Sequence, residues 1–253
     1  MNYIIFDLEF NQALPTTTNI RSNTNSALTF EIIQIGAIKL NKNFEILSTF
    51  NNLIKPTIHK TIHPHVENLT KISNQQLDSS KSLPQIYQDF IKFIGEDESI
   101  LVVWGNTDIK ELLRNLIFHN LPTSYIPKKY IDIQGYASKY LKTPKGSKIG
   151  LGNAVELLNI KFQGEFHDAF NDAYYTSEVF KKIYNDNISP IIYTPRHSNR
   201  IQVVKEKVDV DGLINQFKKM YNRELSEEEK AMIKLAYTMG KTRQFIVNPA
   251  DNL

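Results

Sequence analysis

The sequence contains no cysteine among its 253 residues, which excludes disulfide bonds, thiolate metal sites and cysteine nucleophiles. It has no apolar run long enough to span a bilayer, and its start lacks the basic residues and apolar core of a leader peptide. We therefore expect a cytoplasmic protein with no membrane partner. Neither a phosphate-binding loop nor a dinucleotide-binding glycine pattern is present. The formal net charge of +3 is compatible with a polyanionic partner but does not require one.

The hydrophobic pattern predicts strands at the start of the chain and then strands that alternate with helices. The expected strands are 3–8, 30–40, 44–56, 99–105 and a fifth from 129. The expected helices are 82–95, 106–120, 150–160 and 168–186. This order is typical of an α/β protein with a mixed β-sheet flanked by helices.

The end of the chain has a different character. We predict one domain over residues 1–190, a linker over 191–204 and a small helical appendage over 205–253. Two helices are expected between about 208 and 240, and Ser226 with Glu229 predicts a capping box at the start of the second. Their apolar faces need cover, so we expect them to dock on the first domain, on a protein partner or on another copy in a homo-oligomer.

Four acids and one histidine form the candidate site. Asp7 and Glu9 lie two residues apart at the end of the first strand, so both point to one face. Asp108 lies in the first turn of the helix after a buried strand, and His167 and Asp172 lie at the start of the helix 168–186. One sheet edge can gather all of these positions. Carboxylates without balancing arginines favour Mg²⁺ or Mn²⁺, so we predict that metal holds the pair together.

Each residue also has a purely structural interpretation. Asp108 alone is typical of an acid at the positive end of a helix, while Asp7 and Glu9 could simply be solvated at a strand end. His167 alone could be a surface or capping histidine, and its neighbour Asp168 is expected to be an N-cap. The order and spacing of the whole set favour the functional interpretation.

In that order, the motifs resemble the DEDD-type 3′–5′ exonucleases of the subgroup with a histidine in the last motif (DEDDh). The Asp-x-Glu motif is "FDLEF", the lone aspartate after a strand is in "VVWGNTDIKELL", and the His-x4-Asp motif is in "FHDAFNDAYYTSEVF". The segments "DLEFN", "EIIQIGAIKL" and "IHPHVENLTKI" are similar to the branch of bacterial KapD-type and eukaryotic enhanced-RNAi exonucleases. The resemblance covers about residues 1–190 and implies a ribonuclease H-like fold.

The resemblance also implies a role for each motif residue. Asp7, Glu9, Asp108 and Asp172 would bind two Mg²⁺ or Mn²⁺ ions, and His167 would be the general base. The implied reaction is hydrolysis of single-stranded nucleic acid, with RNA favoured, from a free 3′ end to 5′-mononucleotides. A DNA repair or proofreading exonuclease, or a non-catalytic nucleic-acid-binding scaffold on the same fold, is the alternative. The presence of all five motif residues favours the enzyme.

Four further residues are candidates for substrate binding. Phe10 and Leu69 could stack against or wedge the terminal bases, with core packing as the alternative. Asn11 and Thr70 could bond the terminal sugar.

A separate cluster, His59, His63 and His65, could in principle bind zinc. It lacks the His-Glu-x-x-His pattern, however, and Pro64 disfavours a helix that would present the rings together. We therefore expect loop histidines.

Overall fold

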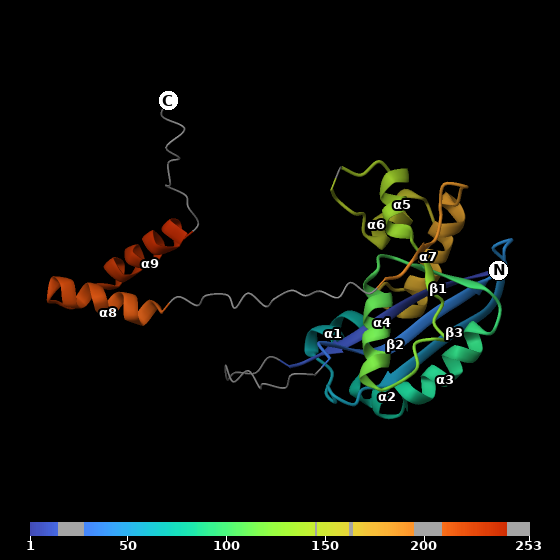
Figure 1. Cartoon of the computed structure of the whole chain (residues 1–253), viewed down its shortest axis with the longest axis horizontal. Coiled ribbons are helices and arrows are strands. Elements are labelled where there is room, and N and C mark those ends of the chain that lie inside the picture. The colour runs from blue at the N-terminus through green and yellow to red at the C-terminus, as the bar shows by residue number, and fades with distance from the viewer. Residues whose placement is uncertain (15–27, 145, 162–163, 195–208, 242–253) are drawn as a thin grey trace. The chain divides into compact units, whose positions relative to one another are not determined.

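The apolar run at the start of the chain forms the central strand of a seven-stranded sheet (Figure 1). This computed structural model describes residues 1–14, 28–144, 146–161, 164–194 and 209–241. The strand order is β4-β3-β2-β1-β5-β6-β7. The strands are β1 (Asn2–Gln12), β2 (Phe30–Leu40), β3 (Ile46–Lys55), β4 (Lys81–Ser82), β5 (Ser99–Val103), β6 (Lys129–Asp132) and β7 (Ile191–Ile192).

The sheet is mixed, as predicted. Strands β1, β2 and β3 pair antiparallel, whereas β5 lies parallel to β1 and β6 lies parallel to β5. The carboxyl ends of β1 and β5 therefore meet at one edge of the sheet, which is where α/β proteins of this kind build their sites.

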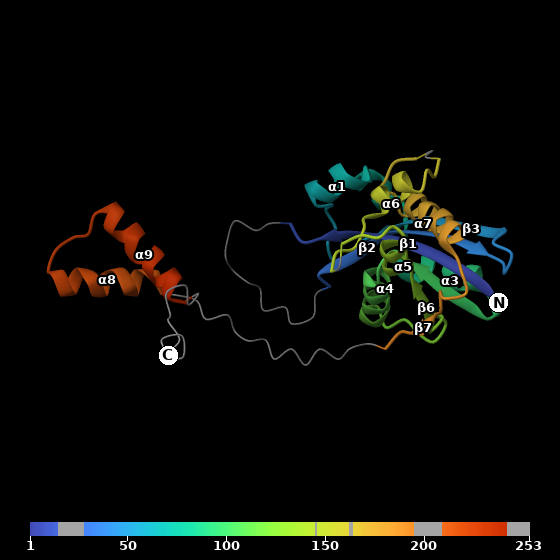
Figure 2. The ribbon, with the colours of Figure 1, turned by 90° about the horizontal axis from the view of Figure 1, so that it is seen from above.

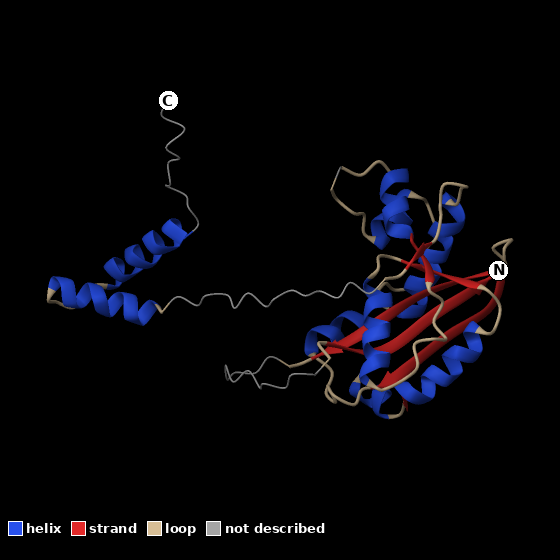
Figure 3. Ribbon diagram, in the orientation of Figure 1, coloured by secondary structure: helices blue, strands red, loops and turns tan. Residues whose placement is uncertain are grey.

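Helices cover both faces of the sheet (Figure 3). The helices of the first part of the chain are α1 (Pro64–Thr70), α2 (Asn74–Asp78), α3 (Leu83–Ile94), α4 (Thr107–Phe118), α5 (Ile133–Tyr140), α6 (Leu151–Leu157) and α7 (Ala169–Ile183). Alternate residues of β1 point to opposite faces: Ile4 and Phe6 pack in the cluster with α3 and α4, while Tyr3 and Ile5 pack in the cluster with α5, α6 and α7. Figure 2 shows α7 and α4 on opposite sides of the sheet.

Among the boundaries that differ from the prediction, two depend on pairing with other strands. Strand β1 runs to Gln12 because its polar end still pairs with β2, from Glu9 opposite Gln34 to Gln12 opposite Phe30, with a bulge after Glu9. The apolar signal fades there, so the pattern placed the end of the strand too early. The predicted linker also begins too early, since β7 pairs antiparallel with β6 and extends the sheet past residue 190. The rest of that linker, from 195, lies outside the described residues.

The chain divides into two compact units, Met1–Arg196 and His197–Leu253. The second contains α8 (Val210–Tyr221) and α9 (Glu227–Lys241). The predicted capping box is present: the Ser226 hydroxyl accepts the N–H of Glu229, and the Glu229 carboxylate accepts the N–H of Ser226. No helix in the described ranges of the chain has the length and hydropathy needed to cross a bilayer.

Candidate active site

Asp7 and Glu9 point from β1 to the face that α7 covers. In the antiparallel register, Asp7 lies opposite Gly36 and Glu9 lies opposite Gln34. Gly36 has a specific reason to be glycine, because a Cβ atom there would lie 2.2 Å from the backbone carbon of Ala169. The missing side chain lets the first turn of α7 approach β2 closely, and this brings the acids of α7 to those of β1.

Asp108 reaches the site from the other side of β1. It lies in the first turn of α4 and is 7% exposed. The position of α4 is fixed by Asn115, which accepts the N–H of Ile32 at 3.1 Å and donates to the carbonyl of Phe30 at 3.0 Å. This fully buried amide ties the helix to the start of β2, which pairs with the carboxyl end of β1, so Asp108 is held at the carboxyl ends of β1 and β5.

The start of α7 carries the last two motif residues. Asp168 caps the helix by accepting the N–H of Asn171 at 3.0 Å, which confirms its predicted role. His167 precedes the cap with a positive φ of 65°, and its backbone N–H donates to Asp172 Oδ2 at 3.2 Å. Its side chain is exposed, unlike that of the neighbouring acids.

The carboxylates raise one another's pKa. Burial is the main cause, and neighbouring negative charges add to it. The pKa of Glu9 rises to about 8, through burial and then the charges of Asp172 and Asp108. Burial, followed by the charge of Asp108, raises the pKa of Asp7 well above its usual range. The pKa of Asp108 rises to about 7 and that of Asp172 to about 6. The site is therefore electrostatically strained when every acid is ionised.

The donor set fits divalent cations. Glu9, His167 and Asp172 each offer one ligand atom, and these atoms lie within 4.8 Å of one another. Asp172 Oδ1 is buried and has no hydrogen-bond partner in the described part of the chain, which is a cost unless something else binds it. Among the described residues, no lysine or arginine forms an ion pair with Asp7, Glu9, Asp108 or Asp172. Oxygen donors in this arrangement suit Mg²⁺ or Mn²⁺.

Asn11 has a structural role, and its burial argues against the predicted bond to the terminal sugar. Its side chain is fully buried. Asn11 Nδ2 donates to the carbonyls of His59 at 2.7 Å and Thr61 at 3.1 Å, and its Oδ1 accepts the N–H of His63 at 2.9 Å. The side chain therefore holds the segment before α1 against β1 and has no surface to offer a ligand.

The other three predicted substrate residues have different surroundings. Phe10 is partly buried against the cluster of α3 and α4, with its ring centroid 6.1 Å from that of Phe30, which is the core-packing alternative. Leu69 is 39% exposed on α1. Thr70 is nearly buried, and its hydroxyl donates to the carbonyl of Val66 at 2.9 Å. For Leu69 and Thr70 a substrate contact stays a prediction.

The three loop histidines do not form a metal group with other His, Asp or Glu residues in the described part of the chain. His59 Nε2 lies 3.0 Å from the carbonyl oxygen of Leu28. His63 caps α1 by accepting the N–H of His65 on Nδ1. His59 therefore contacts the segment before β2, and His65 lies within α1, so the expectation of loop histidines is wrong for His65.

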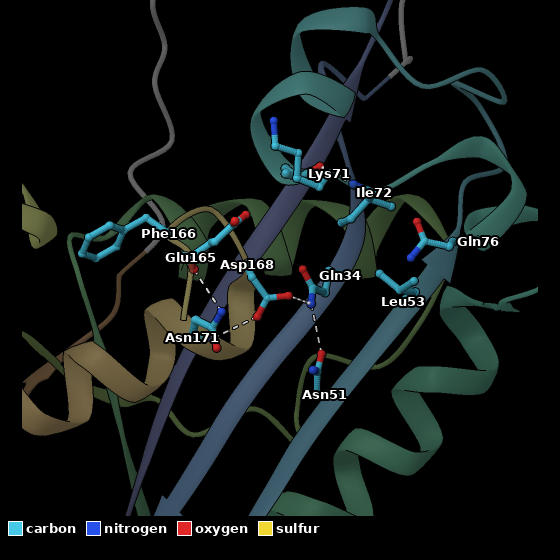
Figure 4. Close-up of a pocket in the computed structure, with 11 residues that line it drawn as sticks. Gln34, Asn51, Leu53, Lys71, Ile72, Gln76, Glu165, Phe166, Asp168 and Asn171 are labelled. Carbon is cyan, nitrogen blue, oxygen red and sulfur yellow. Dashed lines mark hydrogen bonds between the residues drawn. The ribbon is translucent and has the colours of Figure 1, made fainter. Parts of the chain in front are cut away.

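A pocket of about 500 Å³ lies beside the His167 segment (Figure 4). Its floor is the face of β2 and β3, with Gln34 and Asn51. One wall is the end of α1 with Thr70, and the other is the segment that holds Phe166 and Asp168, the two neighbours of His167. Sequence reasoning missed Gln34 and Asn51, because polar residues inside strands have no local pattern that marks them as pocket residues.

Comparison with known proteins places these features in a family. The family model described as "Exonuclease" (RNase_T) matches residues 4–180. The chain is 27% identical over 162 residues to the probable 3′-5′ exonuclease KapD of Bacillus subtilis, and the aligned region covers 62% of this chain and 74% of that protein. It is 24% identical over 191 residues to 3′-5′ exoribonuclease 1 of Homo sapiens, covering 72% of this chain and 54% of that protein. The chain thus spans about half the length of that relative.

The solved structures agree on the fold. The nuclease domain of 3′hExo, a DEDDh family member bound to rAMP, superposes with a TM-score of 0.62 and 23% identity, covering 76% of this chain and 96% of that one. The predicted ribonuclease H-like fold and the predicted DEDDh resemblance, with its KapD-type and enhanced-RNAi branch, are confirmed. The chain belongs to the exonuclease (RNase_T) family.

Proposed function

We propose that this protein is a metal-dependent 3′–5′ exonuclease that hydrolyses single-stranded nucleic acid, with RNA favoured, and releases 5′-mononucleotides. The observation that carries the proposal is the convergence of Asp7, Glu9, Asp108 and Asp172 from three separate elements beside His167. A fold alone does not imply a function, but this set of side chains gives the fold a chemistry.

The four acids would hold two Mg²⁺ or Mn²⁺ ions. When bound, such ions activate a water molecule and stabilise the leaving oxygen of a phosphodiester. Two properties of the site support this assignment. Bound cations would offset the burial and the neighbouring charges that together raise the pKa of Glu9 to about 8. Asp172 Oδ1 would also gain a partner that it lacks among the described residues.

His167 would act as the general base. Its ring is exposed at the edge of the carboxylate cluster, so a ring nitrogen can take a proton from an attacking water and release it to solvent. The positive φ of His167 and the short distance along the chain to the Asp168 cap keep this ring next to Asp172. Asp172 in turn accepts the backbone N–H of His167, so base and acid move as one unit.

The substrate would reach the site along the exposed side of α1. Leu69 offers an apolar surface there, and Thr70 and the pocket lie between α1 and the His167 segment. RNA is favoured because the curated relatives include exoribonucleases. A DNA exonuclease is the alternative, since discrimination depends on a contact to the 2′-hydroxyl, and no such contact follows from the residues in the site.

The test is hydrolysis of 3′-labelled and 5′-labelled RNA and DNA oligomers of the same sequence, with Mg²⁺, with Mn²⁺ and with chelator. We expect mononucleotide release from the 3′ end, loss of activity in chelator and resistance of a circular single strand. Asp7→Ala should abolish hydrolysis, whereas the exposed Asp186→Ala should not. Rapid cutting of circles would identify an endonuclease, and binding of oligomers without hydrolysis under every metal condition would identify a scaffold.

A further inference from the structure

Gln34 carries a buried side-chain amide that links β2, the strand next to Glu9, to the start of α7. It lies on β2 directly opposite Glu9 of β1 and is 3% exposed. Gln34 Nε2 donates to Asp168 Oδ2 at 2.8 Å and to Asn51 Oδ1 at 3.0 Å, while its Oε1 accepts the N–H of Ala169 at 3.1 Å. Figure 4 shows the side chain of Gln34 between those of Asp168 and Asn51. Each polar atom of the amide is thus in use.

Two of these three bonds end on the start of α7. Asp168 is the N-cap and Ala169 is the first residue of the helix. His167 precedes the cap, and Asp172 follows within the first turn. Any shift of the cap relative to β2 would therefore move both His167 and Asp172 relative to Glu9, whose backbone pairs with that of Gln34.

Packing alone does not determine this position. The pocket of about 500 Å³ lies against the cap, and Gln34, Asp168 and Asn171 all line it. The two residues of the start of α7 that line this pocket, Asp168 and Asn171, are both polar. The close approach of Gly36 limits how near the helix can come, but it does not hold the helix in place along the strand. The directional hydrogen bonds of Gln34 supply what packing does not.

We propose that Gln34 is a positioning residue, which sets the placement of His167 and Asp172 relative to Glu9 through its bonds to Asp168 and Ala169. This inference rests on the proposed function of the site. Gln34 does not touch the reacting atoms and acts only through α7. Misplacement of catalytic groups by about 1 Å can cost about 10²-fold in rate, so the effect should be large for a residue outside the chemistry.

The first variant is Gln34→Glu in the full chain. A carboxylate at this position can still accept the N–H of Ala169 but cannot donate to Asp168, and the two carboxylates repel. We expect kcat on a short RNA oligomer to fall by at least roughly tenfold, and Mn²⁺ affinity measured by calorimetry to fall by about tenfold. KM should change by less than about threefold, because Gln34 does not carry a proposed substrate contact.

The second variant is the reciprocal pair Gln34→Glu with Asp168→Asn. It keeps the net charge of the parent and restores a donor and an acceptor with their roles exchanged. Asparagine at 168 still caps α7 through its oxygen. We expect Mn²⁺ affinity and kcat to return to within about threefold of the parent.

Gln34→Met, alone and with Asp168→Asn, is the matched control. Methionine has a similar length but makes no hydrogen bond, so Gln34→Met should lose kcat and Mn²⁺ affinity, and Asp168→Asn should not restore them. It also carries the test if Gln34→Glu fails to fold. Fluorescence of the single tryptophan, Trp104, reports whether each variant is folded.

Three results would overturn the inference. They are parental Mn²⁺ affinity and kcat in folded Gln34→Glu or Gln34→Met, a reciprocal pair no better than Gln34→Glu, and equal rescue of both single variants by Asp168→Asn. Failure of the proposed function looks different, because the parent itself would then neither bind Mn²⁺ nor hydrolyse the oligomer.

Discussion

Replacing Glu9 by glutamine removes one negative charge from the carboxylate cluster and keeps the size of the side chain. In the absence of metal this should stabilise the first unit, although it removes a proposed ligand. The pKa of Glu9 rises from its ordinary value of 4.5 to about 8 in the folded protein, first through burial and then through the charges of Asp172 and Asp108. The folded state therefore binds its proton more tightly than the unfolded state does.

The direction of the pH dependence follows from this difference. Because the folded protein holds the extra proton, its stability falls as pH rises from about 4.5 through about 8. Each pKa unit is worth about 1.36 kcal/mol, so at pH 7 the raised pKa of Glu9 costs roughly 3 kcal/mol of unfolding free energy, because the folded protein keeps a proton that the unfolded chain has lost. For a unit of this size that corresponds to an increase of roughly 6–12 °C in Tm when glutamine, which does not ionise, replaces Glu9. At pH 5 the gain should be less than about 1 kcal/mol.

Thermal or urea unfolding followed by Trp104 fluorescence is the suitable assay, since Trp104 is the single tryptophan of the chain and lies in the first unit. Parent, Glu9→Gln and the exposed control Glu96→Gln are compared in chelator at pH 5 and pH 7. We expect a gain for Glu9→Gln at pH 7 that nearly disappears at pH 5, and no gain for the control. Saturating Mn²⁺ should reverse the order, because it stabilises only a protein that binds it. A gain of equal size at both pH values would show that packing, and not charge, is responsible.

Three further predictions concern catalysis and the two units. His167→Ala should lower the hydrolysis rate by about 10²–10⁴-fold and leave the Mn²⁺ affinity, measured by calorimetry, within about threefold of the parent. Asp172→Asn should instead weaken Mn²⁺ binding, and excess Mn²⁺ should partly restore its activity. If both variants lost Mn²⁺ affinity equally, His167 would be a metal ligand. Deletion of everything after Pro195 should leave hydrolysis of a short oligomer within about tenfold, about 1.4 kcal/mol in barrier, and complete loss in a folded truncation would mean that the second unit completes the site. Asn11→Ala should cost about 1–3 kcal/mol of unfolding free energy for the polar groups it leaves unpaired and should raise KM more than it lowers kcat, since it frees the segment before α1; an unchanged KM would argue against a substrate role for α1.

The predictions that succeeded from sequence are those that depend on local periodicity. Alternation along β1 puts Asp7 and Glu9 on one face whatever the rest of the chain does. Asp168 could be identified as a cap because short polar residues before a helix satisfy its free N–H groups, and the structure shows that bond to Asn171. The mixed sheet followed from the order of strands and helices.

What the sequence did not predict has one physical cause, which is that the residues next to a polar residue in the sequence do not reveal its long-range partners. Asn11 follows the Asp-x-Glu motif and suggests a ligand contact, but its side-chain amide hydrogen-bonds to the backbone of a segment about 50 residues away. The end of β1 and the pairing of β7 with β6 likewise depend on distant strands. Hydrogen bonds of this kind form only when the chain is folded, and they produce no periodic pattern in the sequence.

The sequence by itself determined the candidate set, four acids and a histidine whose order, types and spacing are local properties of three motifs and which we propose carry the chemistry. Only the tertiary structure decided how strongly these acids interact, because burial and mutual distance raise the pKa of Glu9 to about 8. It also decided what holds the site together. Gln34 lies 134 residues from Asp168 in the chain, and only folding of β2 against α7 turns this ordinary strand residue into the link between the two halves of the site.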